Sequence, residues 1–399
     1  MIFSKKSEKV LPSITLEVTS GAKQMKKDGA DTIILGAGEP DFNTPENIRN
    51  IAIKAINDGL TKYTPASGID ELKLAVAKKF KRDNDLIYSN SQIIISTGAK
   101  QCLWNVFETI LNPGDEVIIP KPYWVSYPEL IRLVDGVPVF AFGDEENDFK
   151  YTRPILEDVI SSKTKAILIN TPNNPTGAVY GKDELAMIAD FARTHDLMII
   201  SDEIYEKFNY ENENEKYTSI ANISSDSYNR TIIIQGVSKT YSMTGWRIGY
   251  AVGNEKIISL MASIQSHTTS NPNSIAQYAA VEALNGDQTS VKIMVNEFKN
   301  RRDYIVERIN DTNILSCKKP KGAFYIMINI SKMLGKVIDG HTINNSIDFS
   351  NILLEKVKVA VIPGDGFGVS NYVRISYATS MDNIKEGVKR IINFVKDYE

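Results

Sequence analysis

The sequence has few of the residues that form disulfides or bind metals, with two cysteines and three histidines among 399 residues. Cys102 and Cys317 stand far apart and have neither metal-site spacing nor a disulfide-rich setting. The histidines, His195, His267 and His341, form no cluster in the sequence. We therefore expect no metal ion, and cysteines that stay free in a reducing cytoplasm.

The sequence also lacks a long apolar run and an excess of positive charge. No stretch approaches the roughly twenty apolar residues that span a membrane, and the start, MIFSKKSEKV, lacks the apolar core of a signal peptide. Its 46 basic and 49 acidic residues give a net charge of −3 without a basic tract, which argues against nucleic acid as the main partner. These absences favour a cytoplasmic enzyme that acts on small molecules.

Three apolar runs are present, and each leads into polar residues. The run AILIN opens into TPNNPTG, which holds Asn173, Asn174 and Gly177. The run LMIIS ends at Asp202, and TIIIQG leads to Lys239. Open α/β sheets bind ligands at the carboxyl ends of their strands, so we expect this amide, carboxylate and amine to share one site.

Lys239 is the residue for which this setting matters most. In isolation a lysine is usually a solvated surface residue, and Asp202 in SDEIYE resembles a helix N-cap. Together they suit another chemistry, because a partly desolvated amine near other cations loses its proton readily and can attack an aldehyde. We therefore predict that Lys239 attaches covalently to an aldehyde cofactor, with Arg247, eight positions on, as part of an anion clamp.

A phosphate cradle is predicted in SQIIISTGAKQCLWNVFETIL, which has the pattern of a strand, a glycine turn and an amphipathic helix. Helix N-termini stabilise anions, so Gly98, Ala99 and Lys100 are placed to present backbone donors to a phosphate. A lone glycine more often marks only a tight turn, but this order of elements favours the cradle.

Six separated motifs resemble those of the class I aminotransferases, which are pyridoxal phosphate enzymes of fold type I. The motifs are LGAGEPDF, KYTPASG, NNPTG, SDEIYE, SKTYSMTGWRIGY and VRISYATS, in the family's order over nearly the whole chain. The resemblance is greatest to bacterial aspartate aminotransferases, in the subgroup that includes aspartate/prephenate enzymes.

An α/β fold with two domains follows from this resemblance, and the length and 42% hydrophobic content also favour it. Between residues 47 and 286 short apolar runs alternate with amphipathic segments, as in a mainly parallel sheet between helices. We predict a large cofactor-binding domain at 47–287 and a smaller α+β domain at 288–399. The N-terminal segment, 1–46, is expected to join the small domain.

For the cofactor, pyridoxal 5'-phosphate, the resemblance implies a role for each matching residue. Lys239 would be the covalent attachment point and the catalytic base, and Asp202 would hold the ring nitrogen protonated. Asn174 and Tyr205 would donate to the phenolate oxygen. Trp124 would stack on the ring, although without the motif a core tryptophan is equally expected.

The phosphate would have two further ligands on the same chain by this resemblance. Ser238 would offer a hydroxyl and Arg247 a guanidinium contact, unless Arg247 serves a structural ion pair instead. Position 236 is glycine where many relatives have serine, so one usual hydroxyl contact is missing. Ser238 is the substitute that we expect.

A second subunit is also implied. Tyr63 in TKYTPASG matches a tyrosine that reaches across a homodimer to the partner's phosphate, although by itself it could be half-buried on its own subunit. Ser270 and Asn271 in TTSNPNS are expected to cross the interface too. We therefore predict an obligate homodimer with shared active sites.

Substrate recognition is assigned by the same resemblance. The predicted substrate contacts are Gly38, Trp124, Asn174, Arg374, Lys100 and Thr15. The planar fork of Arg374 suits the α-carboxylate, and Gly38 allows a backbone amide to approach it, unless its loop is a mere linker. Lys100 and Thr15 match residues that help bind a distal carboxylate, which favours dicarboxylic substrates. Leu11 stands where prephenate-active members have a basic residue, so prephenate activity is doubtful.

The function predicted from the sequence is an aspartate aminotransferase that passes the amino group of L-aspartate to 2-oxoglutarate by a ping-pong mechanism. The alternatives are an aminotransferase of broader or aromatic specificity, or a fold type I lyase, because the fold alone does not determine the bond broken. A regulator with an aminotransferase-like domain would need a DNA-binding segment, and the first forty residues contain no basic helix-turn-helix pattern.

Overall fold

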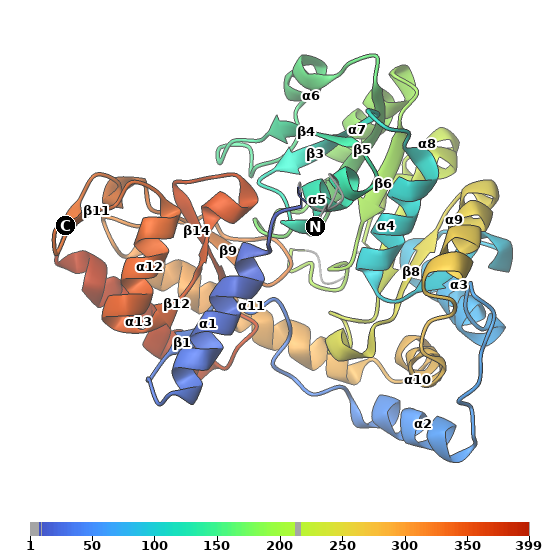
Figure 1. Cartoon of the computed structure of the whole chain (residues 1–399), viewed down its shortest axis with the longest axis horizontal. Coiled ribbons are helices and arrows are strands. Elements are labelled where there is room, and N and C mark those ends of the chain that lie inside the picture. Colours follow the sequence, from blue (N-terminus) through green and yellow to red (C-terminus); the bar gives the residue numbers. More distant parts are fainter. Residues whose placement is uncertain (1–7, 9, 212–216, 399) are drawn as a thin grey trace, which may run out of the picture.

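The computed structural model describes residue 8, residues 10–211 and residues 217–398, and a seven-stranded sheet lies at its centre (Figure 1). The strand order is β2-β8-β7-β6-β5-β3-β4. β8 runs antiparallel to β2 and β7, and all other neighbours are parallel, which confirms the predicted mainly parallel sheet. The strands are β2 (Ile93–Ser96), β3 (Glu116–Lys121), β4 (Val137–Phe142), β5 (Thr164–Asn170), β6 (Met198–Asp202), β7 (Thr231–Gly236) and β8 (Gly249–Val252).

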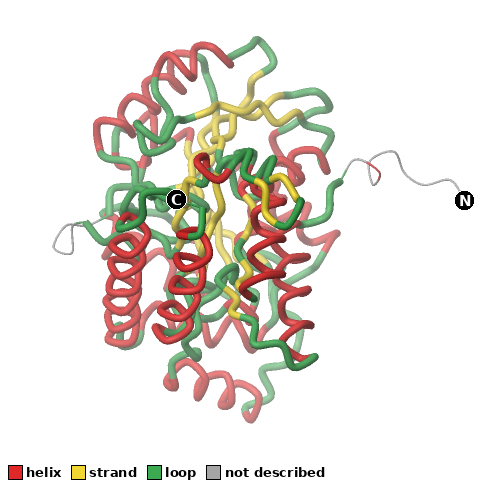
Figure 2. The backbone as a smooth tube through the Cα atoms, turned by 90° about the vertical axis from the view of Figure 1, so that its left-hand side faces the viewer, coloured by secondary structure: helices red, strands yellow, loops and turns green. Residues whose placement is uncertain are grey.

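The central strands are apolar along their whole length because helices cover both faces of the sheet. In β7, Ile232 and Ile234 join a core with α4, α5 and α9, whereas Ile233 packs on the other face with α3 and α10. Figure 2 shows helices on both sides of the yellow strands. The helices of this region are α2 (Glu46–Asn57), α3 (Asp70–Asn84), α4 (Ala99–Ile110), α5 (Ser126–Leu133), α6 (Arg153–Val159), α7 (Lys182–Thr194), α8 (Ser225–Arg230), α9 (Glu255–Thr268) and α10 (Ser274–Asn285).

The C-terminal region has its own small sheet, of order β13-β14-β9, all antiparallel. The segments GAFYIMINI and YVRISYA contain β9 and β14, two strands of the domain that was predicted to be α+β. Long helix α11 extends from beside α10 toward this region (Figure 1). The elements are α11 (Thr289–Asn310), β9 (Tyr325–Asn329), β10 (Val337–Ile338), β11 (His341–Thr342), α12 (Ser346–Val357), β12 (Val359–Ala360), β13 (Ile362–Pro363), β14 (Tyr372–Ser376) and α13 (Met381–Lys396).

The N-terminal elements lie against this C-terminal region. β1 (Ile33–Ile34) pairs in parallel with β12, and α1 (Ile14–Lys27) packs beside β12 and β13. In Figure 1, α1 and β1 accordingly lie next to α12 and α13. The division into domains at residues 46 and 287 stays a prediction.

Two findings concern helices and metal ligands in the described part of the chain. None of its helices is both long and apolar enough to cross a membrane. Residues 8, 10–211 and 217–398 contain no group of three or more histidine, cysteine or acidic side chains that could hold a metal ion. Most of the N-terminal stretch that lacks a signal-peptide core, residues 1–7 and 9, lies outside the described residues.

Candidate active site

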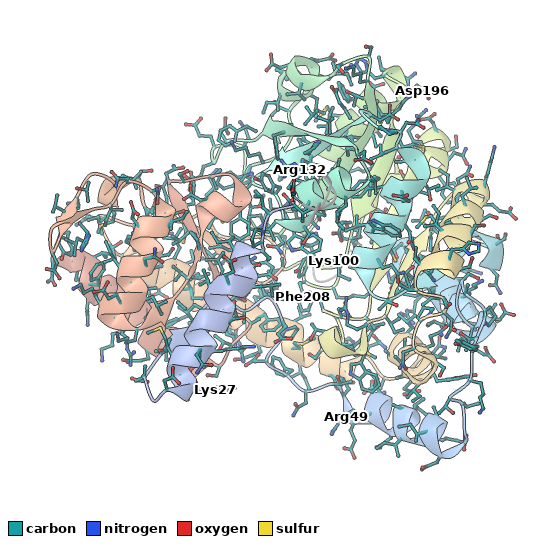
Figure 3. The ribbon with its side chains drawn as sticks, in the orientation of Figure 1. Lys27, Arg49, Lys100, Arg132, Asp196 and Phe208 are labelled. Carbon is teal, nitrogen blue, oxygen red and sulfur yellow. The ribbon has the colours of Figure 1, made fainter. Side chains whose placement is uncertain are left out.

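A cavity of about 440 Å³ lies at the carboxyl ends of β5, β6 and β7 and is closed by α1, the start of α4, and β14. It brings together all the site residues predicted from the sequence except Gly98 and Tyr63. The predicted residues in its lining are Thr15, Gly38, Ala99, Lys100, Trp124, Asn174, Asp202, Tyr205, Ser238, Lys239, Arg247 and Arg374. In Figure 3, Lys100 lies near the middle of the molecule, in the first turn of α4.

Lys239 follows β7 and reaches into this cavity, where its Nζ donates a hydrogen bond to the backbone oxygen of Gly38. Burial lowers the pKa of its ammonium group to about 8. Glu39 raises that pKa, Arg247 and Arg374 lower it, and Asp202 raises it. The amine therefore loses its proton far more easily than a surface lysine does.

Asp202 is the last residue of β6 and is buried. Its Oδ2 accepts a hydrogen bond of 2.6 Å from the hydroxyl of Tyr127, and its Oδ1 accepts one of 3.2 Å from the backbone N–H of Ile204. Burial raises the pKa of the carboxyl to about 6, and the hydrogen bonds from Tyr127 and Ile204 oppose the rise. A turn and not a helix follows Asp202, so the alternative reading of this residue as a helix N-cap is wrong.

Arg374 on β14 is buried, and its guanidinium carbon lies over the ring of Tyr325, at 4.4 Å from the ring centre. Its Nη1 donates to the side-chain oxygen of Asn174 at 2.8 Å, and its Nη2 donates to the backbone oxygen of Gly36 at 3.1 Å. Its Nε is buried and has no hydrogen-bond partner. A buried cation with a free donor is suited to an incoming carboxylate.

Gly98 forms the N-cap of α4 with a φ of +86°, a backbone conformation that favours glycine. A Cβ at this position would lie 2.3 Å from Nη2 of Arg247, so the arginine lies directly against the start of the helix. Its Nη1 donates to the backbone oxygen of Thr244 at 2.8 Å. Ser238 is buried beside the same cavity. A helix N-terminus, a guanidinium and a hydroxyl thus meet in one place, as an anion site requires.

The residues predicted to bind a distal carboxylate lie on two facing elements of the cavity. Thr15 comes from the first turn of α1, and Lys100 comes from the first turn of α4. The Nζ of Lys100 lies 4.9 Å from the ring centre of Trp124, and burial followed by the charge of Arg247 lowers the pKa of this lysine. Leu11 is 66% exposed and is not in the lining.

Four further positions were considered from the sequence, and none of them lines the cavity. Tyr63 is 92% exposed on this chain, and its predicted contact with a second subunit stays a prediction, as do those of Ser270 and Asn271. At position 236, a Cβ would lie 3.0 Å from the Cα of Gly249, so close packing of β7 on β8 accounts for the glycine.

The residues of the lining that were not predicted from the sequence include Asn170, Tyr127, Tyr325 and Glu39. Asn170 accepts a hydrogen bond from the backbone N–H of Asn174, and the hydroxyl of Tyr325 lies 2.9 Å from that of Tyr205. A signal existed for Tyr127, because it stands three residues after Trp124 at the start of a helix. Asn170 ends the apolar run AILIN, whereas Tyr325 and Glu39 depend on contacts that sequence spacing does not reveal.

The sheet is mainly parallel, is covered by helices on both faces, and has a lysine, a carboxylate and an arginine at its carboxyl edge. This arrangement defines an enzyme of the pyridoxal phosphate fold type I class. Residues 30–391 match the family of class I and II aminotransferases, and the chain belongs to that family. The expectation of an aminotransferase is thereby confirmed.

Similar proteins cover essentially the whole chain. It is 47% identical to the aspartate aminotransferase of Bacillus subtilis, over 100% of each chain, and 50% identical to that of Bacillus sp. YM-2, over 96% of this chain and 97% of that protein. It is 48% identical, over 98% of each chain, to a probable aspartate/prephenate aminotransferase of Rickettsia bellii. The structure of the Rhizobium meliloti aspartate aminotransferase superposes with a TM-score of 0.94 at 42% identity, with 98% of both chains covered.

Proposed function

We propose that this aminotransferase transfers the amino group of L-aspartate to 2-oxoglutarate and so produces oxaloacetate and L-glutamate. The observation that carries the proposal is one cavity whose cations include Arg374 and Lys100, together with the amine of Lys239. A dicarboxylic amino acid needs a cation for each carboxylate and a base for its Cα proton. Relatives named aspartate aminotransferase at 46–50% identity support the same substrate.

A solved structure of a similar enzyme with a dicarboxylate also supports this assignment. The aspartate aminotransferase of Thermus thermophilus with maleate superposes with a TM-score of 0.92 at 38% identity, over 98% of this chain and 99% of that one. Maleate carries two carboxylates on a four-carbon skeleton, like aspartate. We infer that the present cavity accepts the same kind of ligand.

The residues of the cavity suit pyridoxal 5'-phosphate. Arg247 and the N-terminus of α4 would hold its phosphate, because a guanidinium and helix N–H groups both favour an anion. Lys239 would bind its aldehyde carbon, and the carboxylate of Asp202 would face its ring nitrogen. When bound, the cofactor supplies a protonated ring that withdraws electrons from the Cα of the substrate.

Lys239 moves the proton on which transamination depends. Its Nζ, with a pKa of about 8, is partly unprotonated at neutral pH and can accept the proton of the substrate Cα. The resulting ammonium can then give the proton back within the same cavity. A lysine of ordinary pKa would hold its proton too firmly to act as the base.

Asp202 and Arg374 prepare the cavity for these steps. Asp202, with a pKa of about 6, is mainly ionised at pH 7, and the hydroxyl of Tyr127 fixes the orientation of its carboxylate. Arg374 would bind the α-carboxylate through its guanidinium and hold it against the side of the cavity formed by Asn174 and Tyr325. Fixing the carboxylate favours removal of the Cα proton over loss of carbon dioxide.

Lys100 and Thr15 are proposed to determine the choice of a dicarboxylic substrate. They face the same cavity from α4 and α1, on elements other than the β14 strand that carries Arg374. Leu11, exposed and uncharged, offers no cation for a second acceptor such as prephenate. We therefore propose that prephenate is a poor substrate, although the Rickettsia bellii relative is named a probable aspartate/prephenate aminotransferase.

We further propose that the enzyme is a homodimer of the cytoplasm. Ile53 and Ile56 on α2, ten and seven residues before Tyr63 in the chain, are 56% and 53% exposed, and exposed apolar side chains of this kind suit a second copy of the chain. The two free cysteines suit a reducing compartment.

The test is a single-turnover screen of amino acids against the cofactor-loaded protein. The change in cofactor absorbance is the readout. Aspartate and glutamate should react, and phenylalanine should react more slowly. Failure of both dicarboxylic amino acids would contradict the roles of Lys100 and Thr15. A parallel assay with prephenate as the amino acceptor tests the inference from Leu11.

The role of Lys239 is tested with a Lys239→Ala variant. This variant should still bind pyridoxal phosphate, without covalent attachment, and should lose turnover by several orders of magnitude. Lys182→Ala is the matched control, because Lys182 is an exposed lysine at the start of α7. Borohydride reduction followed by peptide mapping should place the label on Lys239, and a label elsewhere would contradict the assignment.

A further inference from the structure

Residues 38–44, called the strap below, lie across the loop that carries Lys239. The backbone oxygen of Gly38 accepts the hydrogen bond from Nζ of Lys239. At the other end of the strap, the hydroxyl of Thr44 donates to the backbone oxygen of Ser242 at 2.7 Å. The strap is therefore attached at both ends to the loop that it crosses.

The strap contains two acidic side chains that differ in their partners. Asp41 forms an ion pair with Arg301 on α11, with 2.8 Å between Oδ1 and Nη1. Glu39 instead accepts a hydrogen bond of 2.8 Å from the hydroxyl of Thr244, a neutral group. Among the residues that the structure describes, no cation lies within ion-pair distance of Glu39. Its negative charge is thus held in place without being neutralised.

This held charge belongs to the cavity. Glu39 lines it together with Lys239, and it directly follows Gly38, which contacts the Nζ of that lysine. Among the charged neighbours of Lys239, Glu39 has the largest influence on the amine, ahead of Arg247 and Arg374. Its charge favours the ammonium form, whereas burial and the two arginines favour the free amine.

Other ionisable groups face the cavity from the elements around Lys239. The charged ones, besides Glu39, are Lys23 on α1, Lys100 on α4, Asp202 on β6, Arg247 after the Lys239 loop and Arg374 on β14. The ionisable hydroxyls are the phenol groups of Tyr127, Tyr205 and Tyr325. Burial raises the pKa of each of these tyrosines, so they stay neutral near pH 7. Within this set, the carboxylates that favour the ammonium form are those of Glu39 and Asp202.

We propose that Glu39 is a positioning residue for Lys239. Glu39 acts through the charge of its carboxylate, which Thr244 holds beside the amine. The proposal rests on the proposed role of Lys239 as the base of the reaction. A group that accepts a proton and then gives it back works best when both of its protonation states are accessible at the working pH. Glu39 offsets the burial and the arginines, so that the amine is not trapped in its unprotonated form.

The test measures the ionisation of Lys239 in the full-length protein after removal of any bound cofactor. Acetic anhydride is added at a series of pH values, and acetylation at Lys239 is followed by mass spectrometry of its peptide, with the exposed Lys182 as internal reference. In Glu39→Gln the pH midpoint of acetylation should fall by roughly half a unit to one unit. At pH 7, acetylation of Lys239 should then be about two to five times faster than in the parent protein.

Three further variants separate a charge effect from a general structural one. Glu39→Asp keeps the charge, so its pH midpoint of acetylation should stay close to that of the parent protein. In Thr244→Val the charge remains but is no longer held in place, so the midpoint should fall less than in Glu39→Gln. Glu46→Gln removes one negative charge from exposed Glu46 on α2, outside the cavity, and should leave the midpoint unchanged.

An unchanged midpoint in Glu39→Gln would overturn the proposal, and so would an equal shift in Glu46→Gln. Because the readout needs neither cofactor nor substrate, it is independent of the substrate assignment. Failure of the aspartate assay would disprove the proposed function and leave this measurement unaffected.

Discussion

At the scale of single residues, burial and hydrogen bonds together determine which side chains of the site are charged. Asp202 illustrates the balance, because burial raises the pKa of its carboxyl to about 6 while the hydroxyl of Tyr127 opposes the rise. The side chain would otherwise be protonated over a wider pH range and would face the cofactor ring as a neutral acid. Tyr127 therefore protects the charge on which the proposed electron withdrawal depends.

A Tyr127→Phe variant tests this role at little cost in packing, since the ring keeps its place in the core formed by α4, α5 and β6. Loss of the hydrogen bond should raise the pKa of Asp202, so activity should be lost at a higher pH as the solution is acidified. The acid limb of kcat/KM for aspartate should move up by roughly one unit. An acid limb at the parent position would show that Tyr127 does not control Asp202.

The residue scale also shows where sequence interpretation succeeded and where it could not. Lys239, Asp202 and Asn174 follow apolar strands, so their meeting at one sheet edge could be predicted from local patterns. Tyr325 and Glu39 gave no such signal, because their contacts are with side chains more than a hundred positions away. Spacing along the chain does not report contacts of that kind.

At the scale of elements, the start of α4 is the part of the site with the tightest geometry. Gly98 has a φ of +86°, Arg247 lies against it, and a Cβ at Gly249 would lie 2.2 Å from the backbone nitrogen of Ala99. The strand, the glycine turn and the helix were predicted from the sequence. The need for a second glycine was not, because β8 approaches this turn from a distant part of the chain.

Two glycines with the same φ of +86° provide a matched test of that geometry. Gly98→Ala places a methyl group against Arg247, whereas the Cβ of Gly114→Ala meets nothing within 4 Å. Both variants carry backbone strain of about 1 kcal/mol or more, but Gly98→Ala should lose at least about 1 kcal/mol more free energy of unfolding. Denaturant unfolding measures the difference.

The same pair of variants also tests the phosphate cradle. Gly98→Ala should weaken binding of pyridoxal phosphate, because the displaced guanidinium can no longer lie at the helix start. Gly114→Ala should bind the cofactor like the parent protein. Equal stability and equal cofactor affinity in the two variants would show that Arg247 moves aside without consequence.

At the scale of the whole molecule, the cavity joins segments from both ends of the chain. Residues of α1 and of the strap meet β14 and the carboxyl edge of the large sheet there, so the site exists only in the complete fold. The mainly parallel sheet and the small C-terminal sheet were both predicted from apolar periodicity. The association of β1 with β12 was expected from family resemblance, since two residues of strand carry no signal of their own.

The predicted sharing of sites between two subunits can be tested by mixing variants. Tyr63→Ala alone should impair both sites of a homodimer, and Lys239→Ala alone should abolish both. A mixed dimer has one site with Lys239 and the partner's Tyr63 both intact, so unfolding and refolding the two variants together should restore part of the activity. No recovery, in a mixture shown to contain mixed dimers, would contradict a shared site.

The buried Nε of Arg374 has a consequence for the enzyme between turnovers. A donor that is removed from water and left without an acceptor makes the ligand-free protein less stable than its contacts alone suggest. Any small carboxylate that pairs with the guanidinium of Arg374 should offset part of the cost of burying this cation. The substrate therefore strengthens the fold by the same contact through which it is recognised.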